Sequence, residues 1–206
     1  MSLRTIRRSL IFALFPAAAL LLGACSKMRY VDMQPLEQAG MRYDTTKQLR
    51  ELEVTEQEVA ELLLIKQARL SDAACVEVVR RARSRQQPFT DGEDISSLLD
   101  AGLKEAVVME LVRLEQLGLW TGEYKLMHQA LLSDTLILTL ARRRAEGKPT
   151  VSGGSLARLK NAGVSEGALI ELARRGITDA EADAIFAQRR RGNSESEILR
   201  RYPGRE

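Results

Sequence analysis

The chain has 206 residues, of which 31 are Lys or Arg and 28 are Asp or Glu, so its formal net charge is +3. Residues 1–24 hold three of those arginines and no acidic residue, so the rest of the chain carries 28 charges of each sign. This even balance excludes the strongly basic surface with which proteins bind nucleic acid. Two cysteines and one histidine leave little material for a disulfide framework or a histidine-rich metal site.

The first 24 residues have the composition of a secretory signal peptide. A head with three arginines precedes the uncharged apolar residues 10–22, and the small residues Gly23 and Ala24 follow. This run is shorter than the roughly 20 residues that a membrane-spanning helix needs. The sequence therefore predicts export by the general secretory route, and the pair Arg7 and Arg8 leaves twin-arginine export as the alternative.

The segment Leu22-Gly23-Ala24-Cys25 resembles the lipobox of bacterial lipoprotein precursors, in which an aliphatic and two small residues precede an obligatory cysteine. The resemblance implies that the Cys25 thiol becomes a diacylglyceryl cysteine, that the chain is cut between Ala24 and Cys25, and that the new amino group receives a fatty acid such as palmitate. Each buried methylene contributes about 0.8 kcal/mol, so two or three acyl chains anchor a protein firmly. An ordinary signal peptide that contains a cysteine is the alternative.

The residue after the cysteine concerns the choice of membrane. By resemblance to the sorting rule of some Gram-negative bacteria, Ser26 favours the outer membrane, because aspartate there retains a lipoprotein on the inner membrane. The expected location is therefore the cell envelope, with a lipid anchor in the outer membrane and the protein facing the periplasm. Residues 25–54, which hold Pro35 and Gly40, are expected to form the lipidated N-terminus and a polar linker with a short helical stretch near residues 45–52.

An internal repeat organises the rest of the chain. Five windows of twenty residues align without gaps and start at Leu62, Ile95, Tyr124, Leu156 and Ile185. The starts are 33, 29, 32 and 29 residues apart, so a pair of units recurs about every 61 residues. Apolar residues recur at every third or fourth position, as amphipathic helices require. The repeat predicts an all-α array of about five short helical hairpins over residues 55–206.

Aligned columns predict how each hairpin is built. Four units end the first helix on alanine: Ala68, Ala101, Ala130 and Ala162. Three continue with glycine, which suits a left-handed helix end: Gly102, Gly163 and Gly192. Four offer a serine N-cap for the second helix: Ser71, Ser133, Ser165 and Ser194. All five then place an acid at the positive end of that helix: Asp72, Glu105, Asp134, Glu166 and Glu195. Four end it on arginine: Arg80, Arg113, Arg142 and Arg174.

Further sequence patterns mark where the first helices start and where the array ends. Three pairs fit the capping box: Thr55-Glu58, Thr90-Glu93 and Thr178-Glu181. The last unit has polar residues where the others are mostly apolar or small, as a terminal capping unit needs: Gln188, Arg191, Asn193 and Arg201. Over residues 55–202 the units resemble helical repeats of bacterial envelope proteins. The pattern leaves open whether they form an open solenoid or a compact bundle.

Two single residues invite a chemical interpretation. His128 aligns with Lys66 and Lys160, which predicts a surface position without the partners that a metal site or a nucleophile–base pair needs. Cys75 aligns with apolar residues, which predicts a buried side chain rather than a reactive thiol.

Four longer features have both a structural and a functional interpretation. Residues 152–155, Ser-Gly-Gly-Ser, lack the ending and the preceding strand of a phosphate loop and are expected to start a helix with a serine cap. The arginine groups at helix ends are explained by helix dipoles, with binding of acidic proteins or lipid head groups as the alternative. Trp120, with Leu117, Leu119 and Phe89, is expected to fill gaps between hairpins, with an exposed binding patch as the alternative. A DNA-binding helix-turn-helix is disfavoured by export and by the even charge balance.

No catalytic constellation can be assembled from these residues, and the sequence predicts no catalytic residue, cofactor or metal. We therefore expect a non-enzymatic, lipid-anchored envelope protein that attaches to the membrane through Cys25 and binds a protein partner or serves as a scaffold. Neither nucleic acid nor a small-molecule substrate is expected. One alternative is a structural protein that binds peptidoglycan or anionic lipid head groups. The other is an unrecognised envelope enzyme, which a deep pocket holding two converging carboxylates would favour.

Overall fold

The computed structural model describes residues 31–204, which form helices and no strand. The expected signal peptide, the cut after Ala24 and the lipidation site Cys25 lie outside the described residues. In chain order, the helices are α1 (Gln34–Gln38), α2 (Tyr43–Glu51), α3 (Glu56–Gln67), α4 (Asp72–Ser84), α5 (Gly92–Asp100), α6 (Glu105–Arg113), α7 (Thr121–Gln129), α8 (Asp134–Ala145), α9 (Gly153–Asn161), α10 (Glu166–Arg175), α11 (Asp179–Arg190) and α12 (Glu195–Arg201). The predicted all-α class is confirmed.

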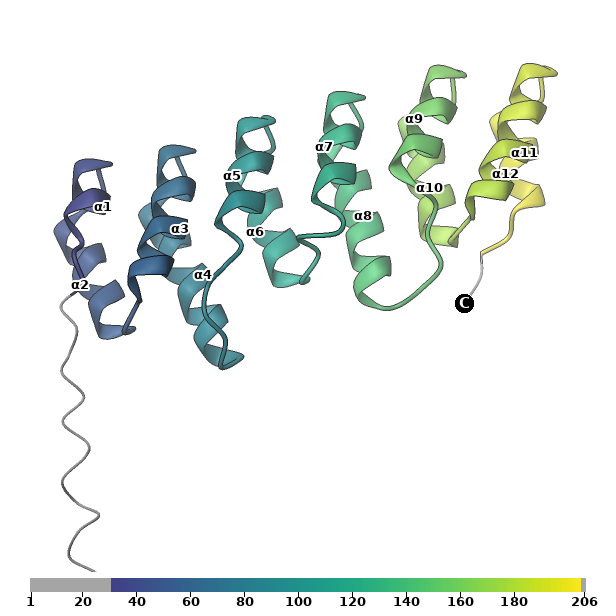
Figure 1. Cartoon of the computed structure of the whole chain (residues 1–206). Coiled ribbons are helices and arrows are strands. Elements are labelled where there is room, and N and C mark those ends of the chain that lie inside the picture. Colours follow the sequence, from purple (N-terminus) through teal and green to yellow (C-terminus); the bar gives the residue numbers. More distant parts are fainter. Residues whose placement is uncertain (1–30, 205–206) are drawn as a thin grey trace, which may run out of the picture. The chain divides into compact units, whose positions relative to one another are not determined.

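The described helices form six hairpins that follow one another in a row (Figure 1). We number the hairpins from unit 1 (α1 and α2) to unit 6 (α11 and α12). Each odd-numbered helix packs on the odd-numbered helices of the neighbouring units, and most even-numbered helices do the same among themselves. Helices pack only within a unit or between neighbouring units. Residues 31–204 are therefore an open helical array of the kind in which each repeat contacts its neighbours.

The turn inside each unit ends the first helix in the way that the aligned alanine and glycine predict. In unit 3, Ala101 is the C-cap and Gly102 has a φ of 97°. The amide of Leu103 then donates to the Leu98 carbonyl at 3.1 Å, and that of Gly102 donates to Leu99 at 2.9 Å. These two bonds are a Schellman motif, in which the aliphatic residue after the glycine covers the helix end. Leu103 is buried, so the turn also contributes to the core.

The predicted serine N-caps are confirmed. The hydroxyls of all four accept a hydrogen bond from the amide three residues later: Ser71, Ser133, Ser165 and Ser194. Capping boxes also form at Thr55 with Glu58 and at Thr178 with Glu181.

The predicted capping box of Thr90 and Glu93 is wrong. Helix α5 begins at Gly92, after Asp91, and Asp91 makes no side-chain capping bond. The amide of Gly92 donates instead to Glu61 of α3 at 2.9 Å. A carboxylate from the neighbouring unit thus binds the first amide of α5, and the helix starts one residue later than the box requires.

The array begins earlier than the sequence predicts. Residues expected to be a linker form unit 1, in which Leu36 and Leu49 are fully buried. The segment Ala39-Gly40-Met41-Arg42 matches the turn at residues 101–104, and Gly40 likewise has a positive φ, of 87°. Pro35 lies in the first turn of α1, where a helix tolerates a residue without an amide hydrogen. It is therefore part of a helix and not of a linker. The folded segment therefore includes residues 33–54.

Candidate interaction surface

The acidic residues at the start of the second helices join neighbouring units. Each reaches back to the N-cap residue of the preceding second helix, about 30 residues earlier, which is Arg42, Ser71, Lys104, Ser133 or Ser165. Glu195, for example, accepts the amide of Ser165 at 2.6 Å and its hydroxyl at 2.7 Å. The sequence analysis assigned this column to the dipole of its own helix and missed these contacts, although an acid recurring 30 to 34 residues after each serine was a usable signal.

In the last unit the serine is bound by an acid of its own helix and not by an acid of a following unit. The amide and the hydroxyl of Ser194 donate to Glu197 of the same helix at 2.8 and 3.0 Å. In the interior units the corresponding serine amide is bound by the next unit instead. A further change is Ala184, which stands where Glu61 and Glu123 accept a first-helix amide from the next unit. These changes support the role of unit 6 as a terminal capping unit.

Most arginines at the helix ends have partners within the described residues. Arg113 contacts Glu77 of the preceding unit at 2.9 Å, and Arg142 contacts Glu110 in the same way at 3.1 Å. Exposed pairs of this kind contribute about 0–1 kcal/mol each. These two pairs occupy cations that the sequence analysis had considered for lipid head groups, so the protein itself neutralises part of the arginine-rich helix ends.

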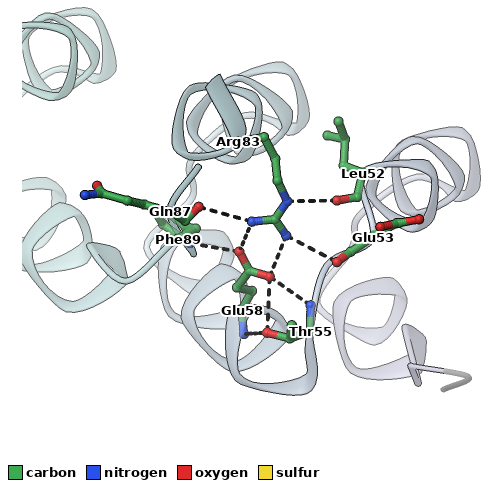
Figure 2. A network of polar contacts seen from close by, with 7 residues as sticks. All are labelled: Leu52, Glu53, Thr55, Glu58, Arg83, Gln87 and Phe89. Carbon is green, nitrogen blue, oxygen red and sulfur yellow. Dashed lines mark hydrogen bonds and ion pairs between the residues drawn. The ribbon is translucent and has the colours of Figure 1, made fainter. Parts of the chain in front are cut away.

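The ion pair with the most buried carboxylate among the described residues joins Arg83 of α4 to Glu58 of α3 (Figure 2). Two guanidinium nitrogens of Arg83 donate to the Glu58 carboxylate at 2.6 and 2.7 Å. The amides of Thr55 and Phe89 add bonds of 2.9 and 2.8 Å. Burial alone would raise the pKa of Glu58, but these donors outweigh it and lower that pKa to about 2.

This network holds three units together. Arg83 also donates to the carbonyls of Leu52 and Glu53, which belong to the loop after unit 1. The Phe89 amide that Glu58 binds lies in the loop before unit 3. Glu58 is only 1% exposed, and both of its oxygens are bound, so the pair is a structural clamp and offers no free carboxylate for catalysis.

Both single residues considered in the sequence analysis, His128 and Cys75, are packed against other parts of the protein. His128 is half-buried, and its ring lies against Gly102 of the preceding turn rather than free on the surface. Cys75 is fully buried, as predicted, and burial raises the pKa of its thiol to about 12. Among residues 31–204, no group of three His, Cys, Asp or Glu side chains could hold a metal ion.

The Ser-Gly-Gly-Ser segment starts α9, as predicted. The Ser152 hydroxyl accepts the amide of Ser155 at 3.2 Å, and the amide of Gly153 donates to Glu123 of α7. Glycine is required at position 153 because an added Cβ would overlap with Met127. Gly153 therefore serves the packing of α9 on α7.

Trp120 is half-buried against the core and lies beneath an arginine of its own unit. The Arg144 guanidinium lies 4.0 Å from the centre of the Trp120 ring and donates to Glu123 at 2.6 Å. The Arg144 side chain is only 5% exposed. Phe89 is buried too, whereas Leu119 is exposed in the loop before α7.

The exposed apolar side chains include two leucines at the end of α7. Leu126 is 46% exposed, and Leu131, in the turn that follows, is 79% exposed. Leu131 has a φ of 57°, in the left-handed region that the equivalent Gly102 and Gly163 also occupy. A leucine in that conformation is strained by about 1–2 kcal/mol. We define Leu126 and Leu131 as the α7 leucine patch.

No helix within residues 31–204 combines the length and the apolar character needed to cross a bilayer. Similarity to known proteins adds no family to this description. No protein-family model matches the chain, and no curated protein matches it either.

Proposed function

We propose that the protein is a non-enzymatic interaction protein of the bacterial cell envelope, anchored by lipid on Cys25, and that it binds a protein partner at the α7 leucine patch. The observation that carries the proposal is the backbone conformation of Leu131, a strained and largely exposed leucine. Strain that persists at an exposed residue is typical of functional positions.

Folding alone does not account for Leu131. Its side chain buries little surface, so it adds little hydrophobic stabilisation. The turn around it is completed by backbone groups: the amide of Leu132 donates to the Met127 carbonyl at 3.0 Å, and Lys160 binds the carbonyl of Leu131. Glycine would make the same turn without strain, as it does in units 3 and 5. A partner that covers the leucine side chain would supply the hydrophobic stabilisation that offsets the backbone strain.

A protein partner is preferred to an anionic lipid or cell-wall surface for an electrostatic reason. Binding to such a surface needs clustered cations that are free to approach it. At the ends of the second helices, Arg83, Arg113 and Arg142 already contact acidic side chains of the protein. An apolar patch on an extended array is better matched to a protein surface.

In-cell photo-crosslinking tests the partner. The cross-linking amino acid replaces Gln129, which is exposed and close to Leu131 in the chain. We expect one defined protein adduct that disappears in Leu131→Gly. The stability of that variant should stay equal or rise by up to about 1 kcal/mol, because relief of strain outweighs the entropy that glycine adds to the unfolded chain. Loss of the adduct thus cannot come from unfolding.

Two controls complete the experiment. Leu119→Ser changes another exposed leucine, at the opposite end of α7, and should retain the adduct. An adduct that survives Leu131→Gly, or its absence from the parent protein, would overturn the partner site. The anchor is tested separately by mass spectrometry of the N-terminal peptide from native cells. Recovery of Met1 together with an unmodified Cys25 would refute the lipid anchor.

A further inference from the structure

A cavity of about 230 Å³ opens between units 2 and 3. At this junction α3 and α5 pack closely, because Gly92 lets the start of α5 approach the backbone of Glu61. The second helices α4 and α6 make almost no direct backbone contact, unlike those at the other four junctions. The cavity lies in the wedge between them, against the loops that follow α4 and α6.

One part of the cavity lining is apolar. It consists of Val78 and Val112 from the second helices and of Phe89 and Leu117 from the two loops. Val78, Phe89 and Val112 belong to the buried core, so this surface is held rigidly. Ligand-binding cavities of drug-sized molecules span roughly 300–1,000 Å³. This smaller cavity suits a single small molecule with an apolar group.

The remaining lining carries balanced charges. Arg85 and Glu115 approach each other to 2.7 Å. Arg81 and Asp91 also line the cavity, and within the described residues neither side chain has a hydrogen bond or an ion pair. Both are half-buried and still reach solvent. The cavity thus offers one unpaired positive and one unpaired negative group beside an apolar surface.

Comparison with unit 2 explains why Asp91 is unpaired. Asp91 occupies the same place in the repeat as Glu58, 33 residues earlier, and Gln116 occupies the place of Arg83. The Gln116 amide donates to the carbonyls of Leu114 and Glu115, and its oxygen accepts the Tyr124 hydroxyl. Unit 3 therefore retains the acid and has lost the guanidinium. Burial and neighbouring Asp94 raise the pKa of Asp91, and Arg85 offsets only part of that rise.

We propose that this cavity binds a small zwitterion, an α-amino-acid group with an apolar stem, whose ammonium pairs with Asp91 and whose carboxylate pairs with Arg81. The apolar stem lies against Phe89 and Leu117. An anion alone would meet Asp91, and a cation alone would meet Arg81, so only a ligand that carries both charges matches the lining. This site is separate from the α7 leucine patch and does not depend on the proposed partner.

Titration of the isotope-labelled full chain, followed by amide NMR at Phe89 and Gly118, tests the proposal. L-leucine should shift these resonances saturably. N-acetyl-L-leucine lacks the ammonium and L-leucinamide lacks the carboxylate, so each should bind at least tenfold more weakly. Nε-acetyl-L-lysine carries the same amino-acid group on a longer stem. Its binding alongside L-leucine would indicate a group that belongs to a larger molecule, and L-leucine binding alone would indicate a free amino acid.

Two variants connect the charges to the ligand. Asp91→Asn should weaken L-leucine at least tenfold and leave N-acetyl-L-leucine unchanged, because that compound has no ammonium to lose. Arg81→Gln should weaken L-leucine similarly and leave L-leucinamide unchanged. A matched control is Arg174→Gln on α10, outside the cavity, which should bind L-leucine like the parent. If no compound shifts the two resonances, or if the blocked compounds bind equally well, the proposal is overturned.

Discussion

The Glu105 carboxylate accepts both the backbone amide and the hydroxyl of Ser71, at 2.9 and 2.6 Å, and so fastens the start of α6 to the start of α4. Ser71 at the same time caps its own helix by accepting the amide of Ala74. One serine therefore connects a local helix signal to a contact between units. The same relationship recurs at Ser165 and Glu195.

Removal of either residue should weaken the array through the same interaction. Glu105→Ala leaves a half-buried amide without its acceptor and should lower the free energy of unfolding by about 1–3 kcal/mol. Urea unfolding of both single variants and of the double variant measures the coupling, which should lie near 0.5–3 kcal/mol. Asp100→Ala, at an exposed site, should change stability by less than about 0.5 kcal/mol. Strict additivity of Glu105→Ala and Ser71→Ala would contradict the contact.

Acid should destabilise the array through two carboxylates with lowered pKa. The pKa of Glu58 falls from 4.5 to about 2, and that of Asp72 falls from 3.8 to about 2, because their donors outweigh burial. The native state then binds fewer protons than the unfolded state, so their contribution is present above about pH 4.5 and is lost as pH falls toward 2. The loss is roughly 3 kcal/mol for Glu58 and roughly 2 kcal/mol for Asp72.

Urea unfolding between pH 7 and pH 2 measures this dependence. Glu58→Gln should lower stability at pH 7, since it leaves Arg83 without its charged partner, and should flatten the acid limb. Glu56→Gln removes an exposed carboxylate from the same helix and should leave the acid limb unchanged. An equally steep acid limb in Glu58→Gln would show that this carboxylate is not responsible.

Adjacent glycines at the start of α9 should respond in opposite ways to alanine. At Gly153 a Cβ would overlap with Met127, so Gly153→Ala should destabilise the protein by about 1–3 kcal/mol. At Gly154 nothing lies within 4 Å, and alanine should be neutral or stabilise the helix by up to about 1 kcal/mol. Gly92→Ala should cost at least as much as Gly153→Ala, because its Cβ would lie 2.6 Å from the backbone oxygen of Glu61. Thermal unfolding compares the three, and equal melting temperatures for Gly153→Ala and Gly154→Ala would contradict the packing.

The buried thiol should report unfolding. Cys75 is inaccessible, and its pKa of about 12 leaves almost no thiolate at pH 8, so a native chain with Cys25→Ser should not react with a thiol reagent. Addition of urea should release one reactive thiol in parallel with the loss of helix measured by circular dichroism. Rapid labelling of Cys75 in the native protein would mean that α4 opens locally.

The parts of the fold that follow from neighbouring residues could be predicted from the sequence. The alanine and glycine of each turn and the serine N-caps act within a few residues, so their pattern was sufficient. Contacts between units were missed, because Glu105 is a plausible partner for its own helix dipole and nothing local indicates Ser71. Unit 1 was missed because α1 has only five residues and Tyr43 stands in the acidic column. The strain at Leu131 needed the backbone dihedral angle, although a leucine among aligned glycines was a hint.

The bond between Ser194 and Glu197 distinguishes the last described hairpin from the interior ones. An interior serine leaves its amide for a following hairpin, so a copy of two consecutive hairpins, inserted between interior ones, would find every required partner already in place. A hairpin appended after the last one would find that amide occupied and Ala184 in place of an acceptor. The contacts between hairpins are therefore compatible with duplication of interior pairs, whereas the last described hairpin lacks the groups that receive a further one.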